Sequence, residues 1–324
     1  MNSEYLALDC GYGNTRLYGR KGGVVLQSLI ATNGSPAVSS WAAGTLKKET
    51  QRPLAIQTAD GEFFVGAGAH RAGRPIENLD LDRMAGPEMK ALLCGALATY
   101  GAPRQAHLLI ALPIALAQGA DGERVKAEVK RNLQGTLSWS ADDTQLALQI
   151  EDVTVTSQPA GAMFDYFIDA QGAMPADKKT LFRSKTFGVL SLGFNTIEMM
   201  VAEEGHLVEK HVAGETAGVR RLLELCNPDR AYSLGELDSK LRAGKLDITT
   251  ALPRWQREVL GQIETHWDKV VRRLATVIVV GGGSYLIRDA LLAKFKDRLF
   301  IPDDPILAIA RGCYKFALYK HGRE

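Results

Sequence analysis

The chain has 324 residues, more than one hydrophobic core usually organises, so two domains are expected. Its 46% apolar and 23% charged residues are typical of a soluble globular protein. A net charge of +2 argues against direct binding to nucleic acid or an anionic membrane, and the lack of a long apolar run or basic leader predicts a cytoplasmic protein.

The first half of the chain alternates apolar strands with glycine turns and helices. The pattern predicts strands at 5–9, 15–20 and 22–30, a hairpin over 54–66, a helix at 86–100, a strand at 107–113, a helix at 120–133 and strands within 145–156. The hairpin turns at Asp60-Gly61, a common turn dipeptide. A further helix begins at Gln158, because Pro159 suits a first helical turn.

The strand pattern restarts after a polar, basic segment at 172–185, which is typical of a surface loop or a domain crossing. The second half predicts strands at 185–193, 195–205 and 206–214, helices near 216–226, 233–242 and 251–274, a strand at 276–280, and helices at 285–295 and 306–320. Three glycines and Ser284 separate the strand at 276–280 from the helix that follows it.

Each half opens with an apolar strand, a glycine turn, Asn-Thr and a second strand. The alignment pairs Asp9, Gly11, Tyr12, Asn14 and Thr15 with Ser191, Gly193, Phe194, Asn195 and Thr196. In this alignment the second copy is one residue shorter and lacks an equivalent of Gly13. The repeat predicts two similar domains that face each other across a cleft.

The first glycine turn, GYGNTR, is a candidate phosphate-binding loop. It is a poor dinucleotide fingerprint and no Walker A loop, because it lacks a third glycine, a following helix and the GK[ST] sequence. Gly11 and Gly13 allow backbone N–H groups to approach oxygens, Asn14 and Thr15 add donors, and Asp9 offers oxygens to Mg²⁺. A plain hairpin turn is the alternative. The glycines at 281–283 strengthen the first interpretation, because they open a helix where an anion is favoured.

Six segments spread along the chain carry a resemblance to a known family: LDCGYGNTR, IALPIAL, TVTSQPAGAMFDY, LSLGFNTIE, VVGGGSYLI and the tail IPDDPILAIARGCYKFAL. In this order they resemble the actin, Hsp70 and sugar-kinase superfamily, and within it the ParM/StbA group of actin-like plasmid-segregation ATPases. The resemblance implies an actin-like (ribonuclease H-like) α/β fold, with duplicated mixed sheets around an interdomain nucleotide cleft. It implies a first domain of 1–157 plus 306–324 and a second of 158–305.

The resemblance also implies roles for individual residues. Asp9 would bind Mg²⁺ and the attacking water, Arg16 would replace the family's usual lysine on the phosphates, and Gln158 would position the water. The second turn departs from the family's Asp-x-Gly, since Ser191 replaces the acid and Glu198 follows later. Hydrolysis is therefore expected to be slow. The remaining residues expected to contact the nucleotide are Gly193, Phe194, Asn195, Thr196, Gly218, Arg221, Glu224, Gly281, Gly282, Gly283 and Ser284.

The function implied is an ATPase that binds Mg²⁺ with ATP (or GTP) and assembles with itself into filaments for plasmid or mobile-element segregation. A DNA-binding adaptor protein is the expected partner. Two alternatives stay open: a nucleotide-binding scaffold with weak hydrolysis, and a small-molecule kinase of the same superfamily. A kinase needs a second substrate pocket with its own acid, and the sequence offers no clear candidate.

Overall fold

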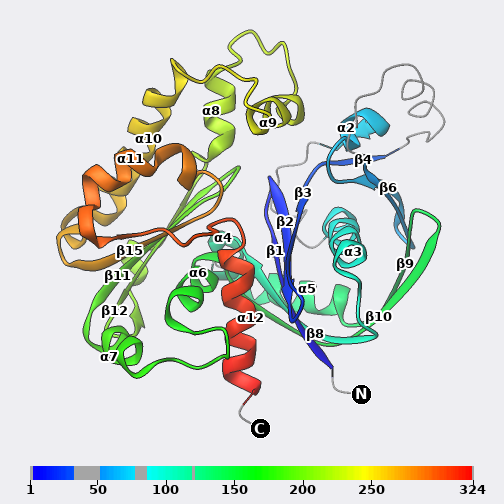
Figure 1. The fold of residues 1–324 in the computed structure, drawn as a ribbon, viewed down its shortest axis with the longest axis horizontal. Helices are drawn as coiled ribbons and strands as arrows, with labels where there is room; N and C mark the ends of the chain where they lie inside the picture. Colours follow the sequence, from blue (N-terminus) through cyan, green and yellow to red (C-terminus); the bar gives the residue numbers. More distant parts are fainter. Residues whose placement is uncertain (1–2, 33–51, 77–85, 119–120, 323–324) are drawn as a thin grey trace. The chain divides into compact units, whose positions relative to one another are not determined.

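The computed structural model describes residues 3–32, 52–76, 86–118 and 121–322 (Figure 1). The chain forms two compact units. The first comprises Met1–Ile110 and Asp121–Val155, and the second comprises Ala111–Ala120 and Thr156–Glu324.

The units differ from the predicted domains in the place of Ala111–Ala120, which the structure groups with the second unit, and in the place of the C-terminal segment. The prediction assigns 306–324 to the first domain, whereas the structure groups it with the second unit. The reason is its helix α12 (Ala308–His321), which packs along α6 (Gln158–Phe167).

A single sheet runs through the described part of the first unit, in the strand order β3–β2–β1–β8–β10–β9–β5–β6–β4–β7. The bounds are β1 Glu4–Cys10, β2 Asn14–Gly19, β3 Gly22–Gln27, β4 Ile30–Thr32, β5 Leu54–Thr58, β6 Gly61–Val65, β7 Arg74–Pro75, β8 Gln105–Leu112, β9 Gly135–Ala141 and β10 Thr144–Ser157. Strands β1, β2 and β3 form two successive antiparallel hairpins. Thus the first glycine turn lies in an ordinary sheet hairpin, as the alternation of residues predicts.

Helix α3 (Pro87–Tyr100) packs against β2, β3 and β5 and buries Leu92, Leu93 and Leu97. Its ends follow from local chemistry: a proline occupies the first turn, and Gly101 ends the helix at a φ of 80°. Among its described residues this unit also has the helices α2 Ala69–Ala72 and α5 Gly122–Leu133.

The second unit has a mixed sheet in the order β13–β12–β11–β15–β16, with β14 also paired to β12. The bounds are β11 Thr186–Leu192, β12 Ile197–Glu203, β13 His206–Leu207, β14 Ala213–Glu215, β15 Leu274–Val280 and β16 Leu299–Phe300. Every residue of β11 is buried because both sheet faces are covered. Leu190 and Leu192 face a core with Trp255 and Trp267, whereas Phe187 packs edge to face on Phe167 of α6.

Helices of the second unit cover both faces of this sheet. Their bounds are α4 Ile114–Gln118, α6 Gln158–Phe167, α7 Ala176–Ser184, α8 Val219–Leu225, α9 Leu234–Arg242, α10 Ala251–Trp267, α11 Ser284–Phe295 and α12 Ala308–His321. Side chains of α8, α10 and α11 form the core on one face, and α6 packs against the other. Within the described ranges, no helix of either unit combines the length and the apolar character needed to cross a membrane.

The contact between α6 and α12 explains the polar residues of the C-terminal motif. Arg311 donates to both carboxylate oxygens of Asp165, at 2.8 and 2.6 Å, and Lys315 donates to Oδ1 at 2.7 Å. The helices approach so closely that a Cβ on Gly312 would overlap the carbonyl oxygen of Gly161. One buried carboxylate therefore pairs with two cations where the helices meet.

Three predicted elements differ from the structure. The polar segment 172–185 contains a helix, α7. None of its residues is buried, so the sequence lacks the periodic apolar residues that indicate a helix. The strand expected at 206–214 is interrupted: β13 and β14 pair separately with β12, and a short 3₁₀ turn, Glu209–His211, lies between them. The helix expected to reach 274 ends at Trp267, because Asp268 has a φ of 28° and a 3₁₀ segment follows.

Candidate functional site

The first glycine turn joins β1 to β2 and carries the acid predicted to face a metal. The Gly11 N–H donates to the Asn14 carbonyl at 3.0 Å, and Asp9 lies directly opposite Arg16 in the ladder. Arg16 Nη1 donates to Asp9 Oδ2 at 2.8 Å and to the Asn14 carbonyl at 3.2 Å. Both side chains are buried, and the guanidinium compensates the buried carboxylate. The two residues predicted to act on metal and phosphates therefore bind each other.

Ser28 supports this turn and was missed by the sequence reasoning. Its hydroxyl donates to the Gly11 carbonyl at 2.6 Å and lies 2.9 Å from Thr15 Oγ1, while its N–H donates to the Gly13 carbonyl at 3.2 Å. Ser28 lies outside the repeated motif. The β2–β3 pairing brings it to the turn, and only the register of that hairpin could have indicated it.

The second turn, between β11 and β12, has the same length as the first. The Gly193 N–H donates to the Thr196 carbonyl at 3.0 Å, and Ser191 lies opposite Glu198 as Asp9 lies opposite Arg16. The predicted alignment, with a missing equivalent of Gly13, is therefore wrong. The prediction aligned the two Asn-Thr pairs by residue type. The hydrogen bonds that close the turns instead make Thr196 the equivalent of Asn14.

The corrected register shows where the charges of the second hairpin lie. Ser191 has no charge, and Glu198 occupies the position that corresponds to Arg16. The Glu198 side chain is buried, and its Oε1 accepts the Ile114 N–H at 2.9 Å. This carboxylate thus holds the start of α4 against β12.

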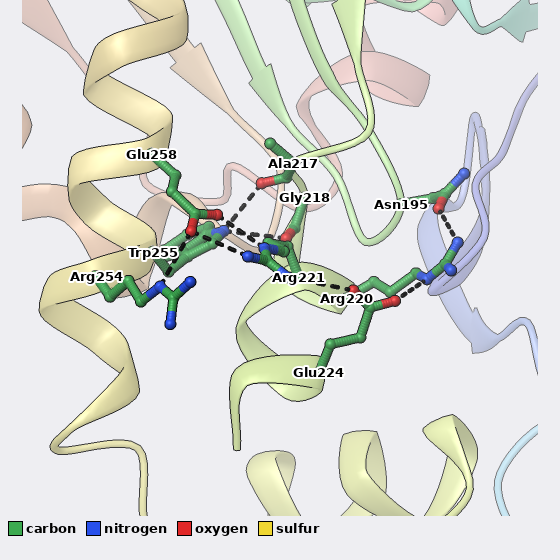
Figure 2. Close-up of polar contacts among 9 residues, drawn as sticks. All are labelled: Asn195, Ala217, Gly218, Arg220, Arg221, Glu224, Arg254, Trp255 and Glu258. Atoms are coloured by element: carbon green, nitrogen blue, oxygen red, sulfur yellow. Dashed lines mark hydrogen bonds and ion pairs between the residues drawn. The ribbon is translucent and has the colours of Figure 1, made fainter. Parts of the chain in front are cut away.

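The start of α8 lies directly on the second turn (Figure 2). The N–H groups of Gly218, Val219 and Arg220 donate to the carbonyls of Asn195, Gly193 and Phe194, at 3.2, 3.1 and 2.7 Å. A Cβ on Gly218 would lie 2.5 Å from the Phe194 oxygen and 2.7 Å from the Gly193 oxygen. Only glycine permits this approach of two backbones.

The glycine triplet lies beside the same turn. The Gly283 N–H donates to the Leu192 carbonyl at 3.0 Å, and a Cβ on Gly281, whose φ is 88°, would lie 2.5 Å from that oxygen. The buried Ser284 hydroxyl donates to the Gly281 carbonyl at 2.7 Å, and a Cβ added to Gly282 would point into open space. The structure therefore brings together three predicted segments of the second unit: the turn, the start of α8 and the triplet.

Arg221 and Glu224, predicted to approach ribose or adenine, are bound to protein groups (Figure 2). Arg221 donates to both oxygens of Glu258 on α10, at 2.8 and 3.1 Å, and these bonds raise the pKa of Arg221 and lower that of Glu258. Glu224 accepts from Arg220 Nε at 2.7 Å. Trp255 fixes the same region, because its indole N–H donates to the carbonyls of Ala217 and Gly218.

Gln158 is the first residue of α6, as predicted, and its side chain is buried. Pro159 occupies the first turn, where its missing N–H breaks no helical hydrogen bond. Ser157 precedes the helix, and its buried hydroxyl has no partner among the described residues. The local geometry is thus that of a fixed polar side chain at a helix start.

Comparisons with known proteins agree with the features described above. Residues 7–161 match the family model for the N-terminal domain of actin-like proteins. No curated protein sequence matches the chain. Among solved structures, apo pSK41 ParM is 18% identical, with a TM-score of 0.72 over 100% of this chain and 99% of that one.

Two further structures have the same fold. The archaeal actin homologue Ta0583, in complex with ADP, is 17% identical, with a TM-score of 0.71 over 98% of this chain and 99% of its own. A 15-stranded ParM filament from Clostridium botulinum is 14% identical, with a TM-score of 0.72 over the same shares. The predicted actin-like α/β fold is confirmed by these matches. The chain therefore has the actin-like fold of these proteins.

Proposed function

We propose that this protein binds a Mg²⁺–nucleoside triphosphate, ATP or GTP, and assembles with itself into filaments that segregate plasmid or mobile-element DNA through a DNA-binding adaptor. The proposal rests mainly on one observation. The turn 193–196, Gly218 and the triplet 281–283 lie together in the second unit. The structural relatives support it, since one contains ADP and another is a filament.

The second unit offers donors and space that fit a phosphate group. The amides of Phe194 and Asn195 lie outside the strands and donate to no atom of the described residues. Successive N–H groups in such a turn form a concave anion site, and the glycines leave the backbone accessible. We assign phosphate binding to this turn, to Thr196 and to the triplet with Ser284.

The first turn offers a donor set that fits Mg²⁺ and phosphate. Asp9 supplies carboxylate oxygen, Arg16 supplies guanidinium donors, and Asn14 Oδ1 is buried without a partner among the described residues. Mg²⁺, when bound, would neutralise phosphate charge and order water. With Mg²⁺ bound, Asp9 and Asn14 would hold the ion through its waters, Arg16 and the amides of the turn would bind phosphate, and Gln158 would orient the attacking water.

A scaffold that binds nucleotide and hydrolyses little is the second candidate. Two observations favour it: Ser191 gives the second hairpin no acid at the position of Asp9, and Asp9 itself is paired with Arg16. Both lower the negative charge available to order a metal and its water.

Sedimentation separates these functions. We expect the protein to pellet with Mg²⁺ and ATP or GTP, and to remain in the supernatant with ADP, without nucleotide, or with EDTA. Phosphate release measured in the same samples distinguishes an active ATPase from a scaffold. Failure to pellet at any protein concentration with either triphosphate would contradict the filament proposal.

We expect Gln158→Ala to slow phosphate release by about tenfold to hundredfold while leaving triphosphate affinity within about twofold. The reason is that a side chain which only orients water contributes to the chemical step and little to binding. Single-turnover phosphate release and equilibrium titration measure the two effects. Gln171→Ala, at an exposed position of the same unit, is the control. Equal turnover in wild type and Gln158→Ala would remove Gln158 from the mechanism.

A further inference from the structure

Arg220, which the sequence reasoning passed over, binds the second glycine turn with its backbone and also with its side chain, whose contact is drawn in Figure 2. Its N–H donates to the Phe194 carbonyl at 2.7 Å, and its Nη1 donates to Asn195 Oδ1 at 3.2 Å. Its Nε donates to Glu224 Oε1 at 2.7 Å. The guanidinium therefore lies beside the turn, between Asn195 and Glu224.

The described residues do not use all the hydrogen-bond donors of the Arg220 side chain. A guanidinium carries five N–H donors, and the bonds to Asn195 and Glu224 use one on Nη1 and the one on Nε. The other three have no partner among the described residues, and the side chain is 34% exposed. Arg220 thus keeps donors in reach of a ligand at the turn.

The neighbouring arginine differs in this respect. Arg221 is equally exposed, but it uses Nε and Nη2 on the two oxygens of Glu258, and its Nη1 lies 3.9 Å from Glu224 Oε2. Glu258 also lies 3.4 Å from Arg254 on its own helix. This network fixes α8 to α10 and uses donors of Arg221 on protein groups.

We propose that Arg220 is a phosphate-binding residue of the nucleotide site, where it donates to the anionic oxygens of a nucleotide held at the turn 193–196. This inference rests on the proposed nucleotide binding. The amides of Phe194 and Asn195, which donate to no described residue, and the remaining guanidinium N–H groups are all hydrogen-bond donors, which suits a phosphate rather than a base or a sugar.

The partners of Arg220 have separate roles in this arrangement. Glu224 accepts the hydrogen bond from Nε of Arg220. This i,i+4 pair on the helix limits the rotation of the guanidinium. Asn195 joins the guanidinium to the turn itself. A simple surface ion pair would need only the first of these contacts.

Calorimetric titration of the full chain with MgATP, MgGTP and the nucleosides adenosine and guanosine tests the proposal. We expect Arg220→Gln to weaken binding of the preferred triphosphate by about tenfold or more, the loss of a charge-assisted bond, and to leave nucleoside affinity within about twofold. Arg220→Lys should recover part of the loss, because it restores the charge without the fork. Arg254→Gln, which removes one cation from an exposed neighbouring position, is the control and should bind as wild type does.

The outcomes distinguish a failure of the role proposed for Arg220 from a failure of the proposed function. An Arg220→Gln protein that binds triphosphate as tightly as wild type overturns the inference and leaves the proposed function standing. Equal losses for triphosphate and nucleoside also overturn it, because they indicate a structural role. A wild-type protein that binds neither triphosphate overturns the proposed function and this inference with it. The urea midpoint of each variant shows whether it is folded.

Discussion

Replacement of Asp165 by alanine is expected to lower the free energy of unfolding of the second unit by about 3–5 kcal/mol. The side chain of Asp165 is 5% exposed and accepts from Arg311 and Lys315, which are themselves largely buried. Its removal takes the shared carboxylate away from two cations in an interior where charge is poorly solvated. Urea titration combined with hydrogen exchange of peptides from α6 and α12 measures the loss and locates it.

Two further variants make this prediction specific. Glu123→Gln removes an acid that pairs with Lys126 on the surface, where Glu123 is 92% exposed, and should change stability by less than about 1 kcal/mol. A triple replacement of Asp165, Arg311 and Lys315 by leucine or methionine should recover much of the lost stability, because apolar packing can replace a buried ion cluster. A loss below about 1 kcal/mol in Asp165→Ala would contradict the argument.

Gly218→Ala is expected to weaken triphosphate binding by about hundredfold. The added methyl group would lie within 2.8 Å of backbone atoms of Gly193, Phe194 and Asn195, and backbone cannot yield as a flexible side chain can. Overpacking of this kind costs about 1–3 kcal/mol, and relief requires the start of α8 to move away from the turn. Calorimetric titration with the triphosphate measures the effect.

Gly261→Ala is the matched control for that change. Gly261 lies inside α10, and nothing lies within 4 Å of the position of its added Cβ. Alanine in a helix interior is favoured over glycine by up to about 1 kcal/mol, so this variant should be slightly more stable and bind nucleotide normally. A Gly218→Ala protein with wild-type affinity would show that the glycine is dispensable to the site.

The sequence was sufficient to predict both glycine hairpins and the strand–glycine–helix unit at 274–295. Each depends on short-range signals: a buried apolar strand, glycines and a change of period. The relation between the hairpins was predicted with the wrong register, because residue letters were matched. The closing hydrogen bonds, Gly11 to Asn14 and Gly193 to Thr196, are the feature that repeats.

The side-chain partners could not be predicted from the sequence. Successive residues on a helix point about 100° apart, so the choice between Arg220 and Arg221 depends on the phase of α8. Their partners, Asn195 and Glu258, are 25 and 37 residues away in the chain. Only the folded sheet and α10 bring these groups to the helix.

The contact between α6 and α12 has a consequence for folding during synthesis on the ribosome. Asp165 and Arg311 are separated by 146 residues, which a ribosome adds in roughly 7 to 30 seconds. During that interval α6 has emerged, but the helix that carries its counterions does not yet exist. The residues of the first unit end at Val155, so this unit can fold early, whereas the second unit can complete its packing only after α12 has been synthesised.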